Sequence, residues 1–283
     1  MFENSAIFSV EIMACVLQVS RSGYYYWRKN KERISAREQR RMDIDESVSA
    51  AFTASKERYG AERIFVDLSK TECPLDIKTI AKSLKRQGLV AKAARLFKVT
   101  TDSDHSEPIA ENLLARDFSA SRPNEKWVSD ITYIQTTDGW LYLAMMIDLF
   151  SRKVIGWSMS ETMEATLVAD ALKMALARRN FPRDVIVHSD RGSQYASKLF
   201  RGLLSKNHLQ QSMSRKGNCW DNACAESFFH SLKVELLYGE PLMSAENTRE
   251  VVFEYIEIDY NRNRRHSANA FVSPEQFEER FVS

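Results

Sequence analysis

The spacing of apolar residues predicts that the chain begins with a pair of short helices. Over residues 8–19 the apolar side chains recur at the period of a helix and form one stripe, made of Phe8, Ile12, Cys15, Val16 and Val19. The pattern breaks at residues 19–23, where Ser20 or Ser22 can cap a second helix. Two helices joined by a tight turn are the parts of a helix-turn-helix. We expect the aromatic residues 24–27 to pack in a core rather than to stack on bases.

A second helical unit follows, and its clearest element has one apolar and one basic face. Residues 33–55 are polar with a helical pattern, and a shorter helix is predicted between a capping Asp76 and a terminating Gly88. One face of this helix is apolar: Ile77, Ile80, Ala81 and Leu84. The opposite face is basic: Lys78, Lys82, Lys85 and Arg86. We expect the basic face to contact phosphates, the alternative being a solvated face without a partner.

Beyond residue 126 the pattern changes to that of strands, with the Asp138-Gly139 pair as a hairpin turn. Strands are predicted at 127–135, 141–150, 153–160, 184–189 and 209–214. The fourth is short and apolar, as is typical of a buried parallel strand. Helices are predicted at 164–179, 197–207 and 222–238. Three antiparallel strands followed by alternating helices and strands is the order of a ribonuclease-H-like α/β fold with a mixed five-stranded sheet.

The helical and the α/β patterns are separated by a stretch without either period. Residues 101–124 are largely polar and contain two prolines, which predicts an interdomain linker. We therefore expect a helical DNA-binding region at 1–100, the linker at 101–124, a core at 125–238 and a helical extension of that core at 239–283.

Composition narrows the class of protein. The 283 residues are 44% hydrophobic and 28% charged, which excludes a disordered or low-complexity chain. The longest apolar run, residues 141–147, is too short to span a bilayer, and residues 1–20 lack the basic start of a secretory signal. Four scattered cysteines argue against a disulfide framework. We expect a soluble cytoplasmic protein with no membrane partner.

The net charge of +2 conceals an uneven distribution. Residues 1–126 hold 22 Lys and Arg against 18 Asp and Glu, whereas the rest of the chain holds 18 against 20. Residues 78–98 alone carry seven basic side chains and no acid. This asymmetry indicates a polyanionic partner for the N-terminal third.

Three carboxylates stand out by their positions. Asp130 lies inside the first predicted strand, where a buried charge needs a partner, and Asp190 ends the fourth strand, at the sheet edge where ligands bind. Glu226 lies early on a predicted helix. If the first and fourth strands are neighbours, Asp130 and Asp190 face each other and Glu226 can reach over them. Three hard oxygen ligands suit Mg²⁺ or Mn²⁺, and two such ions ~3.5–4 Å apart would promote an in-line phosphoryl displacement.

The motifs around these acids make a family resemblance visible. The chain resembles bacterial insertion-sequence transposases with a retroviral-integrase-like catalytic core, specifically the second-frame (orfB-type) proteins of two-frame elements. The core motifs are Trp127 with Asp130-Ile131-Thr132-Tyr133, His188-Ser189-Asp190-Arg191-Gly192-Ser193-Gln194-Tyr195, and Asp221-Asn222-Ala223 with Glu226. The flanking motifs are Val19-Ser20-Arg21-Ser22-Gly23-Tyr24-Tyr25 with Trp27, Arg58-Tyr59-Gly60, Lys233, and Tyr260-Asn261 with Arg265-His266 and Pro274.

The resemblance implies a metal-dependent enzyme that cuts and joins DNA. Water would attack the phosphodiester at the element's end, and the freed 3′-hydroxyl would attack a second one, typically through a circular intermediate. Asp130, Asp190 and Glu226 would be the catalytic metal ligands, and Lys233 would hold DNA beside them, unless it is a solvated helix lysine. The resemblance also implies a homo-oligomer on DNA and a first-frame (orfA-type) partner, often joined to this chain by frameshifting.

Other residues have smaller expected roles. Lys216 belongs to a cationic loop, residues 214–218, expected at the rim of the site, with a surface loop of no function as the alternative. His188 is expected to shape the strand end near Asp190, with work as a general base as the alternative. Asp148 is expected to be structural, and Asp221 to cap the helix of Glu226. Two further functions stay open from the residues alone: a non-catalytic DNA-binding repressor or inhibitor of transposition, and a ribonuclease acting on RNA–DNA hybrids.

Overall fold

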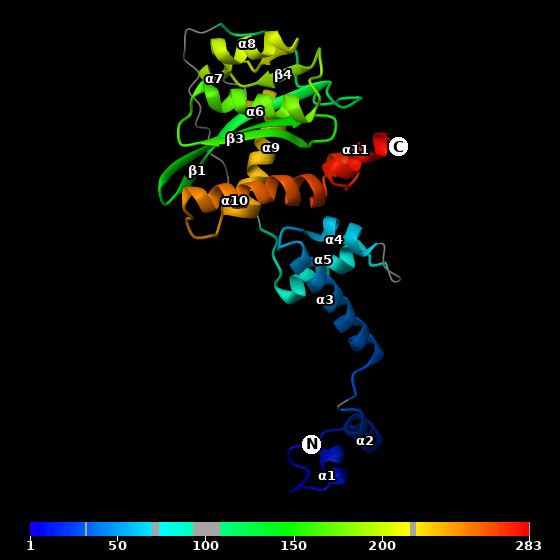
Figure 1. The fold of residues 1–283 in the computed structure, drawn as a ribbon. Coiled ribbons are helices and arrows are strands. Elements are labelled where there is room, and N and C mark those ends of the chain that lie inside the picture. Colours follow the sequence, from blue (N-terminus) through cyan, green and yellow to red (C-terminus); the bar gives the residue numbers. More distant parts are fainter. Residues whose placement is uncertain (32, 70–73, 93–107, 216–218, 283) are drawn as a thin grey trace. The chain divides into compact units, whose positions relative to one another are not determined.

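The computed structural model describes residues 1–31, 33–69, 74–92, 108–215 and 219–282. The chain divides into two compact units, Met1–Val90 and Ala91–Ser283 (Figure 1). None of the helices over these residues combines the length and the apolar character needed to span a bilayer.

The first unit is entirely helical. Its helices are α1 (Val10–Val16), α2 (Arg21–Asn30), α3 (Ala36–Ala54), α4 (Ala61–Leu68) and α5 (Ile77–Gln87). Ser20 caps α2, since its Oγ accepts the Gly23 N–H at 3.0 Å. A Cβ at position 23 would lie 2.7 Å from that Oγ, so glycine leaves room for the cap. Of the two serines that could cap this helix, Ser20 does so.

The aromatic cluster of α2 does not pack as expected. Tyr24 is buried, but Tyr25, Tyr26 and Trp27 are 53%, 73% and 47% exposed. The predicted stripe of α1 is also largely exposed, and Met13 and Ala14 are buried in its place. The expectation of a buried cluster is therefore wrong for three of the four aromatic residues. The physical reason is size, because two short helices have too little surface to cover so many large side chains.

Helices α3, α4 and α5 share a small core, made of Val48, Phe52, Ile64, Ile80 and Leu84. Helix α5 follows Asp76 and ends at Gly88, whose φ of 66° is the left-handed conformation that glycine adopts readily. Its buried face is narrower than predicted, since Ile77 and Ala81 are exposed and Ser83 is buried instead.

The second unit is built on a mixed five-stranded sheet, as the sequence predicts. Its strands are β1 (Lys126–Thr136), β2 (Gly139–Asp148), β3 (Val154–Ser160), β4 (Ile186–Ser189) and β5 (Gln210–Met213), in the order β3-β2-β1-β4-β5. The pairs β1–β2 and β2–β3 are antiparallel, whereas β1–β4 and β4–β5 are parallel. With helices on both faces, this is the integrase-core, ribonuclease-H-like architecture.

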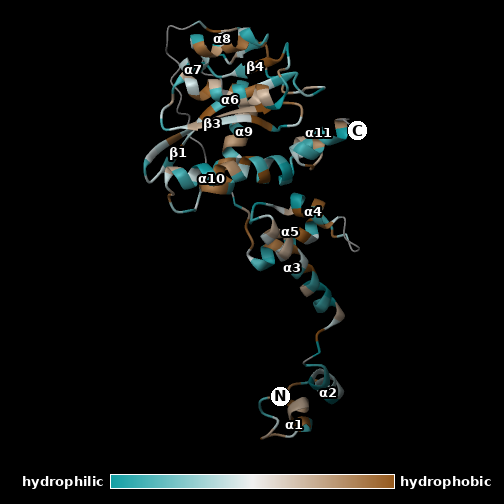
Figure 2. Ribbon diagram, in the orientation of Figure 1, coloured by the Kyte–Doolittle hydropathy of each residue, from teal (hydrophilic) through white to brown (hydrophobic). Residues whose placement is uncertain are grey.

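The two faces of the sheet form two hydrophobic cores, because side chains alternate along each strand. Trp127, Ala144 and Met146 pack with α6 (Ala165–Arg178), α7 (Ser193–Ala196) and α8 (Lys198–Lys206). Their neighbours Val128, Leu143 and Met145 pack on the other face with α9 (Ala223–Leu232) and α10 (Ala245–Glu254). Figure 1 shows these helices above and below the strands, and Figure 2 shows hydrophobic and hydrophilic segments alternating along α8 and α10.

The helix predicted at 222–238 changes character part of the way along. A 3₁₀ turn (Cys219–Asn222) precedes α9, and α9 ends at Leu232, where a wider π-helical segment (Lys233–Leu237) begins. After α10 come a second π-helical segment (Tyr255–Asn263), a 3₁₀ turn (Ser267–Asn269) and α11 (Pro274–Val282). The seven-residue interval from Glu226 to Lys233 therefore does not lie within one regular α-helix.

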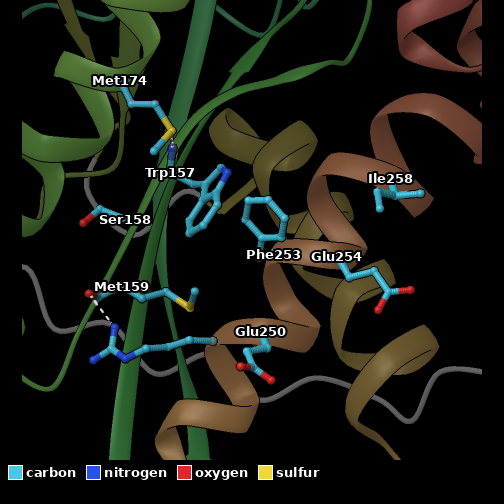
Figure 3. A pocket seen from close by; sticks show the side chains of 9 residues that line it. Trp157, Ser158, Met159, Met174, Glu250, Phe253, Glu254 and Ile258 are labelled. Atoms are coloured by element: carbon cyan, nitrogen blue, oxygen red, sulfur yellow. Dashed lines mark hydrogen bonds between the residues drawn. The ribbon is translucent and has the colours of Figure 1, made fainter.

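The C-terminal segment also covers the free edge of the sheet at β3. Asn261 accepts the Val154 N–H and donates to the Val154 carbonyl, both at 2.9 Å, and Arg249 donates to the Met159 carbonyl. These contacts satisfy backbone groups that would otherwise be open to another strand. A groove beside the same strand is lined by Trp157, Met159, Met174, Arg249, Phe253 and Ile258 (Figure 3).

Candidate active site

The pairing of β1 with β4 brings the two aspartates together. The two strands are neighbours and parallel, and their register pairs Val128 with His188. Asp130 and Asp190 each lie two residues beyond this pair, and the negative charge of Asp190 acts on Asp130. The condition stated from the sequence, that the first and fourth strands be adjacent, is therefore met.

Backbone amides orient both carboxylates. Oδ1 of Asp130 accepts the Ile131 N–H at 2.9 Å, and Oδ1 of Asp190 accepts the Gly192 N–H at 2.9 Å. Both bonds come from residues at most two positions further along the chain, so the carboxylates are fixed by the local backbone.

The electrostatics of the pair are unfavourable without a counter-charge. Burial raises the pKa of Asp130 well above its ordinary value, and the negative charges of Asp190 and Glu226 raise it further. The ammonium of Lys233 acts in the opposite direction. Like charges held close together in a partly buried site shift pKa values in the way that is typical of functional sites.

Glu226 lies in the first turn of α9 and its side chain is exposed, although partial burial still raises its pKa. The start of α9 is tied to β1 beside Asp130. Nδ2 of Asn222 donates to the Ser129 carbonyl at 3.1 Å, and the Ser129 Oγ donates to the Met145 carbonyl and lies 2.9 Å from the Tyr195 hydroxyl. Sequence reasoning missed Ser129 and Asn222 as supports, because their partners are distant in the chain.

Asp221 does not cap α9 as expected, since Asn222 occupies the N-cap position. Its fully buried carboxylate instead accepts hydrogen bonds from Arg215, Arg116 and Asn112. The Arg215 guanidinium holds the pKa of Asp221 well below its usual range. A carboxylate buried in the turn before α9 is costly unless it is paired, and here arginines from two other segments pair with it.

Lys233 is not a solvated helix lysine. Its side chain is only 9% exposed, and its Nζ lies 4.9 Å from the centre of the Tyr133 ring. Burial lowers its pKa, whereas the charge of Asp130 raises it. The ammonium therefore lies within electrostatic reach of the aspartate pair.

The chemistry of the three carboxylates suits a divalent ion, but their side chains are not close enough together to form a complete set of ligands. Asp130, Asp190 and Glu226 offer only hard oxygen ligands, which Mg²⁺ and Mn²⁺ prefer. Among the described residues, however, no three His, Cys, Asp or Glu side chains lie close enough together to form a metal-binding cluster. The structure thus places the charges of Asp190 and Glu226 within electrostatic reach of Asp130, but the three do not form a closed set of ligands.

Two neighbouring residues are structural, as predicted. His188 is buried between the hydroxyls of Ser212 and Ser214, at 2.8 and 3.1 Å, and burial lowers its pKa to about 4. Asp148 is fully buried, accepts two backbone N–H bonds and lies 3.4 Å from Arg179. Neither side chain is placed among the three acids.

The basic residues predicted to bind DNA fall into two groups. Lys78, Lys82 and Lys85 are exposed on α5, opposite its buried face. Arg86, also exposed, is paired with Asp45 of α3, which in addition accepts the Ser83 hydroxyl at 2.6 Å. Arg86 therefore has a structural partner as well, and its contact with DNA stays a prediction. Lys216 lies outside the described residues.

Comparisons with known proteins agree with this architecture. Two family models, each described as an integrase core domain, match residues 120–219 and 226–281. The transposase InsF for insertion sequence IS3A of Escherichia coli K12 is 55% identical over 276 residues, covering 98% of this chain and 96% of the relative. The 31 kDa protein of insertion element IS600 from Shigella sonnei is 39% identical over 95% of this chain and 98% of its own length. Among solved structures, the HTLV-2 integrase catalytic core domain in complex with magnesium is similar over 56% of this chain and 99% of its own, with 16% identity and a TM-score of 0.44.

Proposed function

This chain belongs to the insertion-sequence transposases with an integrase core, which transpose DNA by strand cleavage and strand transfer, and from that premise we propose that Asp130, Asp190 and Glu226 are its catalytic metal ligands. The observation that carries the proposal is the parallel pairing of β1 with β4, since Asp130 and Asp190 each follow the paired residues Val128 and His188 by two positions. The raised pKa of Asp130 supports it, because a bound dication would offset the repulsion among the carboxylates.

Divalent ions, Mg²⁺ or Mn²⁺ and two in number, would activate the attacking oxygen and stabilise the leaving oxygen. The protein's own residues hold and orient the reactants. The amides of Ile131 and Gly192 keep the aspartate oxygens in place, and Asn222 fixes the start of the helix that carries Glu226. Glu226, exposed at the first turn of α9, would complete the ligand set when DNA and metal bind.

Lys233 would bind a DNA phosphate beside the acids. Its ammonium is buried against Tyr133 and within reach of Asp130, so it is held in place at little cost in side-chain freedom. A charge-assisted hydrogen bond to a phosphate is strong in such a partly desolvated position. Further from the acids, Lys78, Lys82 and Lys85 would bind phosphates of the element end, and Lys216 would contact DNA at the rim.

The wider setting follows from the same premise. The enzyme would act in the cytoplasm on element ends and target DNA, as a homo-oligomer assembled on DNA. A first-frame product, or a frameshift fusion with it, would supply recognition of the element's ends. An overlapping upstream reading frame and inverted repeats in the flanking DNA would support this arrangement.

A nicking and joining assay tests the proposal. The substrate is a labelled duplex carrying the inverted repeat that flanks the coding frame, incubated with Mg²⁺, with Mn²⁺ or with EDTA. We expect metal-dependent cleavage by the wild type and none by Asp130→Asn, Asp190→Asn or Glu226→Gln, with DNA binding retained. Near-normal cleavage by one variant would remove that residue from the set. Binding without cleavage by the wild type would instead indicate a repressor or inhibitor, and cleavage of RNA–DNA hybrids alone a ribonuclease.

A further inference from the structure

An exposed aromatic pair lies on the β1–β2 hairpin, with Tyr133 on β1, the strand that carries Asp130, and Trp140 on β2. Tyr133 is 38% exposed and Trp140 is 50% exposed. Their ring centres are 5.1 Å apart with the planes at 87°, an edge-to-face arrangement. Neither ring belongs to the two cores of the sheet as the structure defines them.

Lys233 connects this pair to the acids. Its Nζ lies 4.9 Å from the centre of the Tyr133 ring, and the same ammonium is close enough to Asp130 to favour its ionised form. Lys233 is therefore the residue that contacts Tyr133 and also acts electrostatically on Asp130. Since Lys233 and Trp140 both approach Tyr133, the indole of Trp140 is the larger aromatic surface left open to a ligand.

The hairpin that carries Trp140 is anchored at its turn. The Thr137 N–H donates to the Met243 carbonyl at 2.9 Å, and Oδ2 of Asp138 accepts the Ala245 N–H at 2.7 Å. A ring on an anchored turn loses little freedom when a ligand stacks on it.

We propose that Tyr133 and Trp140 form a stacking site for an unpaired nucleobase at the DNA end whose phosphate is bound beside Asp130. This inference rests on the proposed function and adds to it the recognition of a splayed end. An unpaired base at such an end can stack on an exposed aromatic ring, whatever its sequence, because every base has a π-face. Lys233 supplies the positive charge for the adjoining phosphate.

A substrate–protein cycle tests the stacking. Single-turnover joining is measured for the wild type, Trp140→Ala and Trp140→Phe, on pre-cleaved inverted-repeat ends that are intact or abasic at the last, second or third nucleotide. Stacking on an aromatic ring should make Trp140→Ala about 5- to 100-fold slower on the intact end, while Trp140→Phe recovers most of the rate. On the end that lacks the base which stacks on Trp140, the wild type and Trp140→Ala should join at equal rates, because the indole then has no base to contact. Phe253→Ala is the matched control, because Phe253 is 49% exposed and contacts Trp157 edge-to-face at 5.9 Å.

A binding measurement keeps the test independent of chemistry. The same ends carry 2-aminopurine at the sensitive position, and its fluorescence is recorded without metal. We expect quenching by the wild type and Phe253→Ala, and its loss in Trp140→Ala at an unchanged melting temperature. An equal loss of rate on intact and abasic ends, or quenching unaffected by Trp140→Ala, would overturn the stacking site. Quenching by a wild type that cannot cleave or join would support the stacking site and count against the proposed function alone.

Discussion

His188 and Asp148 show how burial, as the largest cause, shifts the pKa of single residues near the sheet. Burial lowers the pKa of His188 from 6.5 to about 4 and raises that of Asp148 from 3.8 to about 6. The unfolded chain protonates His188 below pH 6.5 and the folded chain does not, so this residue costs stability as the pH falls from 6.5 to 4. Asp148 acts oppositely, because the folded chain takes up its proton first and gains stability as the pH falls from 6 to 4.

His188→Gln should isolate one of these opposing effects. The glutamine does not titrate, so the difference in unfolding free energy between the wild type and this variant should shrink by on the order of 2–3 kcal/mol from pH 7 to pH 4. Urea denaturation at several pH values measures it. Asp148→Asn is the control of opposite sign, for which the difference should grow as the pH falls. A difference for His188→Gln that does not vary with pH would mean that His188 titrates normally in the folded protein.

Lys233→Met tests the role of the buried ammonium while keeping most of the side-chain volume. A lost charge-assisted contact of ~1.5–3 kcal/mol corresponds to roughly ten- to hundredfold in rate when it is felt in the transition state. We expect that loss in single-turnover joining of a pre-cleaved end, and partial recovery in Lys233→Arg. Lys173→Met, at an exposed lysine of α6, should behave as the wild type. Wild-type joining by Lys233→Met would exclude Lys233 from the site.

At the scale of elements, a network around Glu235 holds the π-helical segment that follows α9 and begins at Lys233. Arg264 donates to both oxygens of Glu235 and to the Ser231 hydroxyl, and the Tyr255 hydroxyl donates to Glu235 at 2.9 Å. Glu235 lies in the π-helical segment that begins at Lys233. The network therefore fixes the segment that positions the buried ammonium.

Arg264→Met should destabilise the second unit by about 3–5 kcal/mol, because it leaves the Glu235 carboxylate buried without its main partner. The double variant Glu235→Leu with Arg264→Met should recover part of this loss, since no charge then remains to be compensated. Urea denaturation measures both. Lys173→Met breaks a pair in which both side chains are more than half exposed, and should change stability by less than about 0.5 kcal/mol. An Arg264→Met protein as stable as that control would show that the network contributes nothing.

The basic face of α5 calls for a test that leaves its structural ion pair intact. Replacing Lys78, Lys82 and Lys85 by alanine should reduce the log–log salt slope of DNA binding by up to ~2.7, at ~0.9 per phosphate contact. The melting temperature should stay constant, because all three side chains are exposed. Arg86→Ala should instead lower it, since Asp45 loses its partner. An unchanged salt slope in the triple variant would leave this face without a DNA contact.

At the scale of the whole molecule, the sequence predicts the α/β unit better than the helical one. Every strand of the sheet follows from alternation and turn residues, and Asp130 and Asp190 follow from their positions on those strands. In the first unit, Tyr25, Tyr26 and Trp27 are exposed because burial depends on how many helices meet, which periodicity does not report. Helix α4 was not among the predicted elements.

The supports of the site could not be predicted, for a related reason. Asn222 with Ser129, and Arg116 with Asp221, are each joined across about a hundred residues of chain, and only the fold brings them together. Glu235, in the π-helical segment that begins at Lys233, is likewise bound by Arg264 from 29 residues further along the chain. Local sequence therefore identifies the carboxylates, while the groups that orient them come from tertiary structure.

The most direct test of the central claim, that Asp130 and Asp190 jointly bind the catalytic metal, is a ligand exchange at Asp190. Cleavage by Asp190→Cys is measured in Mg²⁺ and then in softer ions, Mn²⁺ or Cd²⁺, with folding checked by circular dichroism. A thiolate is a poor ligand for Mg²⁺ and a better one for softer ions. The account predicts no cleavage in Mg²⁺ and recovered cleavage in Mn²⁺ or Cd²⁺. Cleavage in Mg²⁺ at close to the wild-type rate would contradict it.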